Sequence, residues 1–267
     1  MFYILNVFVV KCITIFVSFI FSIVLTNTLS QSDVGVFLTG ITLMTAISIF
    51  IKSGFDTHII RINALSLNKF SNYLILTILT FIPYILILIL VSIYFKERNI
   101  FVYFIIASWC ISYFGISAAY LKSLGKIKIA TLIEISLLHL FVMVIYILSP
   151  AQINLEISVL IFLCVSLFLS LIIALILFKK NKFVIFKWKF DLKNNFKNSF
   201  SIMITDLLDF LVIWIPSFFL FYYATEEIAA QFQIALRVTF LLALPAVVFN
   251  SISSPIIALY LKKKIKF

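Results

Sequence analysis

The segment DLLDFLVIWIPSFFLFYY, residues 206–223, consists almost entirely of side chains suited to the interior of a lipid bilayer. About 20 apolar residues in a helix cross the roughly 30 Å of a bilayer's hydrocarbon layer. Two carboxylates, Asp206 and Asp209, nevertheless stand three residues apart near the start of this segment, on one face of the predicted helix. An acid at the centre of a spanning helix costs roughly 2.5–3.5 kcal/mol on insertion scales. We therefore expect other residues of the chain to compensate these charges.

The whole chain has the composition of a membrane protein. Of its 267 residues, 64% are apolar and 12% are charged, whereas a soluble domain has about 45–50% apolar and about 25% charged residues. The sequence therefore predicts an all-α membrane protein with no soluble domain between its helices. Eight membrane-spanning helices are predicted, at about residues 4–29, 34–53, 73–95, 100–121, 128–149, 155–178, 200–223 and 228–249.

The basic residues predict an orientation in the membrane. If both termini are cytoplasmic, the inside connectors hold 17 of the 21 Lys and Arg residues, and the outside connectors hold only Lys96 and Arg98. Cytoplasmic connectors carry such an excess of Lys and Arg in membrane proteins. The net charge of +11 then faces anionic membrane lipids. No groove of stacked aromatic residues accompanies the basic ones, so we expect no nucleic-acid partner.

The longest inside connector divides the chain. Residues 179–199, KKNKFVIFKWKFDLKNNFKNS, separate six predicted helices in residues 1–178 from two in residues 200–267. Apolar residues recur at helical spacing among its Lys and Asn residues. This pattern predicts a short, basic amphipathic helix that lies on the inner leaflet.

A weak internal repeat relates the two parts. Residues 27–50, NTLSQSDVGVFLTGITLMTAISIF, and residues 222–247, YYATEEIAAQFQIALRVTFLLALPAV, share a helix end, a short acidic turn and a new apolar helix. Such repeats are typical of transporters built from two related bundles.

Helical rise places one acid and one base at similar depth. At 1.5 Å per residue, Asp209 lies about 13.5 Å from the inner end of its helix, and Arg237 lies about 16 Å from the inner surface. A buried ion pair compensates both charges better than either is compensated alone, so we predict an Asp209–Arg237 pair. Two interpretations remain open: a static lock inside the bundle, or a polar site on the wall of a water-filled cavity. Asp206 lacks an equally good partner and favours the cavity.

Three other polar residues lie within the predicted helices. Glu134 lies near the inner end of its helix, where it can reach Lys128 or water. Lys11 lies near the inner end of the first helix, from which a long side chain extends to the headgroups. His139 lies near mid-depth and is expected to be a packed residue.

Four segments, taken in order, resemble one transporter family. They are residues 21–62, FSIVLTNTLSQSDVGVFLTGITLMTAISIFIKSGFDTHIIRI; 120–135, YLKSLGKIKIATLIEI; 190–210, FDLKNNFKNSFSIMITDLLDF; and 231–260, QFQIALRVTFLLALPAVVFNSISSPIIALY. Together they are similar to polysaccharide and O-antigen flippases of the multidrug/oligosaccharidyl-lipid/polysaccharide exporter superfamily. The first segment carries the polar-acidic turn, the Gly35-x-Phe37 opening and the GFDT…Arg61 ending of these proteins.

The resemblance implies a transporter rather than an enzyme, in the bacterial cytoplasmic membrane, with two six-helix bundles that open alternately around a central cavity. It implies a lipid-linked oligosaccharide substrate, carried on a polyprenyl diphosphate and moved to the outer leaflet, and other glycan-assembly membrane proteins as partners. A cationic cavity suits the diphosphate. The candidate substrate-binding residues are Arg237, Arg61 and Lys11, and the candidates for ion coupling or a buried pair are Asp206, Asp209 and Glu134.

The chain departs from the family in its predicted helix number. Family members have twelve or fourteen helices, whereas eight are predicted here, two of them standing for an incomplete second bundle. Because rocking requires two bundles, we expect a truncated product, a fragment or one part of an assembly. Whether the chain transports by itself is left open.

Two other functions compete with the flippase interpretation. A multidrug or cation exporter of the same superfamily is one alternative. An intramembrane prenyltransferase is another, but Mg²⁺–diphosphate chemistry needs clustered carboxylates from two helices, and Asp206 and Asp209 form the only DxxD motif suited to it. We expect no cofactor, no metal and no disulfide, because the cysteines lie far apart in apolar segments. These cysteines are Cys12, Cys110 and Cys164.

Overall fold

The computed structural model describes residues 2–63, 100–149, 153–180 and 192–243, together with residues 245, 246, 249 and 253. Within these ranges the regular structure is helical and no strand occurs, so the predicted all-α fold is confirmed. The helices are α1 (Phe2–Thr28), α2 (Gln31–Lys52), α3 (Phe55–Asn63), α5 (Ile100–Ser123), α6 (Ile127–Thr131), the π-helical segment η1 (Leu132–Ser136), α7 (Leu137–Leu148), α8 (Leu155–Lys180), α9 (Leu192–Tyr223) and α10 (Glu226–Leu242).

The chain is a multi-pass membrane protein. Among the described helices, five are long and apolar enough to cross a bilayer, and a sixth is added if α6 and α7, bent by 51°, form one span. Most predicted spans agree with observed helices within a few residues. The predicted helix at residues 73–95 and the end of the one at 228–249 lie outside the described residues.

The connector at residues 179–199 differs from its prediction. Its last part is not a separate amphipathic helix but the first turns of α9, which runs without interruption from Leu192 to Tyr223. The physical reason is local: no Gly or Pro stands between residues 192 and 200 to end the helical hydrogen bonding. Residues 181–191 lie outside the described part of the chain.

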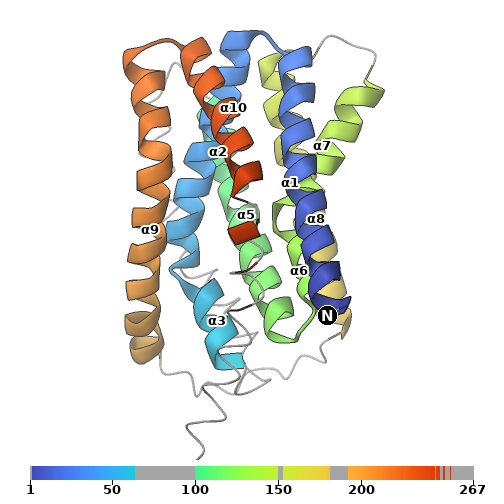
Figure 1. Cartoon of the computed structure of the whole chain (residues 1–267), viewed down its shortest axis with the longest axis vertical. Coiled ribbons are helices and arrows are strands. Elements are labelled where there is room, and N and C mark those ends of the chain that lie inside the picture. Colours follow the sequence, from blue (N-terminus) through green and yellow to red (C-terminus); the bar gives the residue numbers. More distant parts are fainter. Residues whose placement is uncertain are drawn as a thin grey trace, which may run out of the picture.

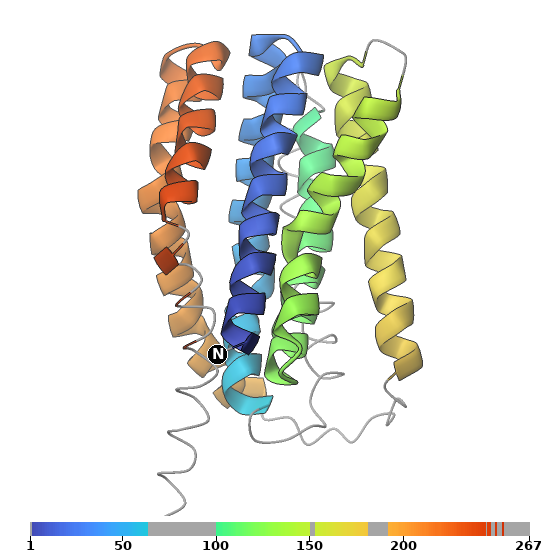
Figure 2. The ribbon, with the colours of Figure 1, turned by 45° about the vertical axis from the view of Figure 1, so that its right-hand side comes forward.

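The helices run up and down along one axis, with α1, α2 and α5 between the α9–α10 pair and the α6–α8 segment (Figures 1 and 2). The α1–α2 and α9–α10 turns lie at one end, which we call the hairpin end. The α5–α6 turn, with Lys122, Lys126 and Lys128 in and around it, lies at the opposite end, which we call the basic end. Buried aromatic rings join the central helices: Phe37 of α2 packs edge-on against Phe104 of α5, at 5.3 Å between ring centres, and against Phe162 of α8, at 5.7 Å.

The sequence repeat corresponds to two similar helical hairpins. Ser30 caps α2 by accepting a hydrogen bond from the Asp33 N–H, and Thr225 caps α10 by accepting one from the Ile228 N–H. Both helices start at the hairpin end and run in the same direction (Figure 1), in contact from Gly35 and Glu226 to the bond between Thr42 and Gln233. This is the arrangement that parallel repeats produce.

Small residues set the distance between α2 and α10. A side chain at Gly35 would collide with the backbone carbonyl of Glu226 at the start of α10. Ala229 and Ala230 are buried on the facing side of α10, and the Ser32 hydroxyl donates to the Glu226 carboxylate. Glycine and alanine let helix backbones approach closely in membranes, where polar side chains then bond across the contact.

Gly54 also allows two helix backbones to approach closely, here at the basic end. It adopts a φ of +70°, and an added side chain would collide with the Ser199 carbonyl of α9. The preceding Ser53, also left-handed at φ 49°, ends α2 by donating its N–H to the Ile49 and Phe50 carbonyls. The α2–α3 corner therefore fixes where the start of α9 packs.

Replacing Gly35 by Ala should lower the free energy of unfolding by about 1–3 kcal/mol, because the new methyl group meets backbone that cannot move aside. Thermal unfolding of the purified protein in detergent measures the effect. Gly115→Ala is the matched control: it is also helical, but its methyl group meets the flexible Lys52 side chain at 3.0 Å. Equal stability of the two variants would contradict the proposed role of Gly35.

Candidate functional site

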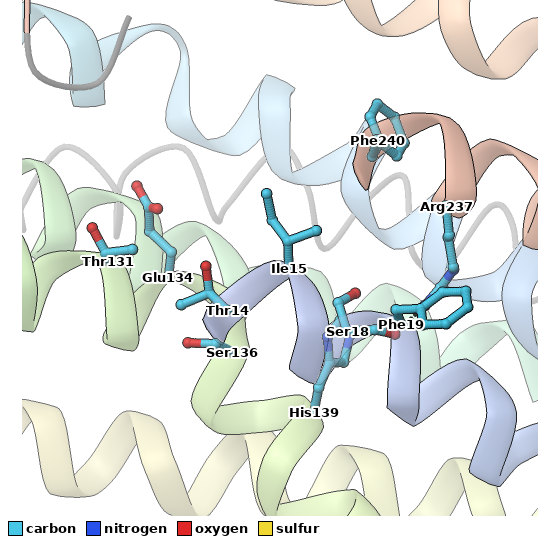
Figure 3. Close-up of a pocket in the computed structure, with 10 residues that line it drawn as sticks. All are labelled: Thr14, Ile15, Ser18, Phe19, Thr131, Glu134, Ser136, His139, Arg237 and Phe240. Carbon is cyan, nitrogen blue, oxygen red and sulfur yellow. Dashed lines mark hydrogen bonds between the residues drawn. The ribbon is translucent and has the colours of Figure 1, made fainter. Parts of the chain in front are cut away.

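A cavity of about 310 Å³ lies between α1, the α6–η1–α7 segment and α10 (Figure 3). It is the best candidate for a functional site because a carboxylate, a guanidinium and an imidazole line one cavity among predominantly apolar helices. Its polar lining residues are Thr14, Ser18, Thr131, Glu134, Ser136, His139 and Arg237. Two of the site residues predicted from the sequence, Glu134 and Arg237, line this cavity, and a third, Lys11, forms an ion pair with Glu134.

Arg237 joins α10 to α1. Its Nη1 donates to the Ser22 hydroxyl at 2.7 Å and to the Ser18 carbonyl at 3.3 Å. At 1.5 Å per residue, the eleven positions from Glu226 to Arg237 place the Arg237 Cα about 16 Å from the start of α10 at the hairpin end. Both observed partners are neutral, so the cavity wall carries a cation that these groups solvate but do not neutralise.

The predicted Asp209–Arg237 ion pair is not formed in this structure. Arg237 turns toward α1, whereas Asp209 is exposed on α9. Similar depth on adjacent helices does not specify how each helix is rotated about its axis. The rotation of α10 follows from its contact with α2, where Ala230 and Gln233 are buried, and that contact carries Arg237 away from α9.

Glu134 lies between two lysines from different helices. Its Oε2 accepts from Lys11 of α1 at 3.3 Å, and its Oε1 accepts from Lys122 of α5. The expected neighbour Lys128 is instead exposed, because six residues of helix do not place two side chains on one face. Glu134 belongs to η1, and π-helical turns are frequent at functional sites.

His139 is both packed and placed at the cavity. Its ring stacks on Phe21 of α1, with ring centres 4.6 Å apart and planes 9° apart. This agrees with the packed role expected from sequence. Its Nδ1 is nevertheless buried without a hydrogen-bond partner in the described structure, so the ring also offers a polar atom beside the cavity.

The remaining predicted residues lie elsewhere. Asp206 is half-buried and within electrostatic range of Lys52 and Asp56, which form an ion pair at 3.0 Å. The repulsion that Asp206 feels from Asp56 exceeds the attraction of Lys52, so this ion pair does not compensate the first of the two acids on α9. Arg61 belongs to α3, but its side chain lies outside the described part of the chain.

The ion pair with Lys52 lowers the pKa of Asp56. Burial alone would raise the pKa of its carboxyl, but the Lys52 ammonium and the Thr57 N–H hold that pKa below its ordinary value of 3.8. Asp56 therefore stabilises the corner between α2 and α3 as a carboxylate.

Sequence analysis missed Gln233. This buried side chain donates to the Thr39 hydroxyl at 3.0 Å and accepts from the Thr42 hydroxyl at 3.3 Å, which joins α10 to α2. A signal for it exists in the sequence: Gln233 precedes Arg237 by four residues, so the two polar side chains lie close together around an apolar helix.

No known protein family, curated protein or solved structure matches the chain. In the part that the structure describes, no three His, Cys, Asp or Glu side chains gather as metal ligands would.

Arg237→Gln should lower the free energy of unfolding by about 1–3 kcal/mol, because charge-assisted hydrogen bonds to α1 are lost. Asp209→Asn should change it by less than about 0.5 kcal/mol, as is usual for an exposed position. Thermal unfolding in detergent compares the two variants. A loss of similar size in both, restored by the charge swap Asp209→Arg with Arg237→Asp, would show that the ion pair exists after all.

Asp56→Asn should destabilise the protein by about 1–3 kcal/mol at pH 7. Because the pKa of the folded-state carboxyl is lowered, its contribution is fully present above pH 3.8, the ordinary value, and is lost as the pH falls through the lowered value. Unfolding temperatures of wild type and variant should therefore converge under strongly acidic conditions. A difference that stays constant with pH would contradict an electrostatic role.

Proposed function

We propose that the chain is a transporter of the flippase type, which moves lipid-linked oligosaccharide or polysaccharide precursors across the bacterial cytoplasmic membrane. The observation that supports the proposal best is Arg237 on the wall of the cavity between α1, η1, α7 and α10. A guanidinium presents five N–H donors in a planar fork that matches phosphate oxygens. The observed bonds of Arg237 to α1 are both donated by Nη1, which leaves further donors for a diphosphate.

The contact between the two hairpins also supports transport. Thr39, Thr42 and Gln233 join α2 to α10 through hydroxyl and amide groups. Such groups can exchange their mutual hydrogen bonds for bonds to water or to sugar hydroxyls when two helices separate. An apolar contact would expose only hydrocarbon to a polar substrate and would offer it no hydrogen bonds.

The charges at the cavity favour an anionic over a cationic substrate. The carboxylate that lines the cavity is that of Glu134, and two lysines already bond to it. Export of organic cations is therefore the weaker of the two transport functions. We further propose that the basic end faces the cytoplasm and anionic lipids, which places the cavity within reach of a substrate made in the inner leaflet.

The test uses the purified full chain in proteoliposomes that contain a fluorescent oligosaccharide on a polyprenyl diphosphate. Movement between leaflets is measured by quenching the outward-facing label. Wild type should move the lipid, and Arg237→Gln should slow it by at least about tenfold, as expected for losing a charged bond to the phosphate.

Lys128→Gln is the matched control, because it also removes one positive charge but lies exposed on α6. The control should move the lipid at the wild-type rate. Transport of a cationic dye without movement of the glycolipid would overturn the proposal in favour of a drug or cation exporter. An Arg237→Gln variant as active as wild type would remove Arg237 from the substrate site.

A further inference from the structure

Asp209 is an acid of the bundle that no cation of the described chain compensates. Three lysines and three other acids interact with one another toward the basic end and balance in charge; they are Lys11, Lys52, Lys122, Asp56, Glu134 and Asp206. Asp209 acts on this group as a further negative charge beside Asp206. In the part of the chain that the structure describes, its own carboxylate has neither an ion pair nor a hydrogen bond.

This acid lies deep in the membrane-spanning part of α9. The span runs from Ser199 to Tyr223, so ten positions separate Asp209 from one end and fourteen from the other, or about 15 and 21 Å along the helix. Long Lys and Arg side chains reach the headgroups from within a span, but aspartate is too short to do so. Because the side chain of Asp209 is exposed, it faces lipid unless another molecule covers it, and an acid in the hydrocarbon layer is costly.

Asp209 belongs to a row of exposed residues along one side of α9, which we call the acceptor stripe. Its members are Thr205, Asp209, Val212, Ile213 and Pro216. Their spacing is that of one helix face. α10 packs against a different side of α9, where the rings of Trp214 and Phe240 lie 6.0 Å apart. The acceptor stripe is therefore open, on a helix at the edge of the bundle (Figure 1).

Three hydrogen-bond acceptors lie along the acceptor stripe. Pro216 has no N–H, so the Val212 carbonyl lacks the donor that a regular helix provides four residues later. The Thr205 hydroxyl donates to the Ser201 carbonyl at 3.1 Å, which leaves its oxygen as an acceptor. The Asp209 carboxylate lies between these two groups, about one turn from each. Inside a membrane, such groups obtain their donors from neighbouring helices.

We propose that the acceptor stripe binds a membrane-spanning helix of another protein, and that this helix carries an arginine at the depth of Asp209. Among lipid chains a donor can be brought to this depth by a helix, because irregular backbone is not tolerated there. A guanidinium offers five N–H donors in a planar fork, enough for both carboxylate oxygens and for the Val212 carbonyl about 4.5 Å further along the axis. A lysine ammonium is a compact point charge with three donors, so it fits the two acceptors less well.

A second copy of this chain does not supply the cation. A two-fold axis along the membrane normal would place two identical acceptor stripes opposite each other. Two acids would then meet without a donor, and like charges repel strongly where the dielectric constant is low. Arg237 of the second copy could not reach them, since it lies inside its own bundle and bonds to Ser22.

The test offers the full chain a synthetic helix of defined chemistry. The protein, labelled at its N-terminus, is placed in phosphatidylcholine nanodiscs with labelled polyleucine helices of about 21 residues, and binding is measured by energy transfer. One peptide carries arginine at its central position and the other carries glutamine there, so the peptide's direction of insertion does not matter. The arginine peptide should bind wild type about tenfold more tightly than the glutamine peptide, and Asp209→Asn should abolish this difference.

Two further variants test the geometry of the acceptor stripe. Pro216→Ala restores the N–H that the Val212 carbonyl lacks, so it should reduce the preference for arginine over lysine at the central position of the peptide. The preference for either cation over glutamine should remain. Leu208→Ala is the matched control, because Leu208 is 56% exposed on α9 but lies outside the acceptor stripe; this variant should bind all three peptides as wild type does.

Three results would overturn the proposal. Equal binding of the arginine and glutamine peptides to wild type would show that water or another segment of the chain already satisfies Asp209. An arginine preference that persists in Asp209→Asn would place the binding site elsewhere. Energy transfer between two labelled copies of the protein, lost in Asp209→Asn, would assign the acceptor stripe to self-association. None of these measurements involves transport, so glycolipid movement that requires Arg237 can hold whichever result is obtained.

Discussion

The close contact between α2 and α10 is the constraint on which the site depends. Gly35 lets the two backbones meet at the Glu226 carbonyl, and Ala230 and Gln233 fill the rest of the contact. Because a helix is rigid, this contact fixes the rotation of α10 about its axis. One turn beyond Gln233, the same rotation directs Arg237 onto α1, where it bonds to Ser22 and borders the cavity. Without the small residues at one end, the cation would not lie at the site.

The buried charges are compensated in three different ways. Lys52 and Asp56 pair within a single turn of the chain, and Asp206 lies in the field of that pair. Glu134 is shared by two lysines from separate helices. Arg237 is solvated by a hydroxyl and a carbonyl, without a carboxylate among its observed bonds. The first arrangement carries one more negative than positive charge, which offsets the extra lysine of the second, whereas Arg237 leaves a positive charge on the cavity wall.

Sequence analysis predicted the depth of residues well and their rotation poorly. Apolar runs marked the spans to within a few residues, as in α5 (Ile100–Ser123), and charges inside those runs identified Lys11, Glu134 and Arg237 as candidates. Their partners could not be predicted, because hydropathy and helical rise specify position along an axis but not the direction of a side chain around it. That direction depends on contacts between distant segments: Lys11 and Glu134 are 123 residues apart, and no sequence signal marked η1.

Contacts between distant segments also couple the cavity to the arrangement of the hairpins. Arg237 and Ser22 are 215 residues apart, so their bond exists only when the α9–α10 hairpin is docked on the α1–α2 hairpin. Separating these hairpins would expose the Arg237 guanidinium together with the hydroxyl and amide groups of Thr39, Thr42 and Gln233. Polar groups that bond to each other in the docked state would then require water or a polar ligand. Only a ligand that bonded to these side chains more strongly in the separated than in the docked arrangement would shift the balance between the two.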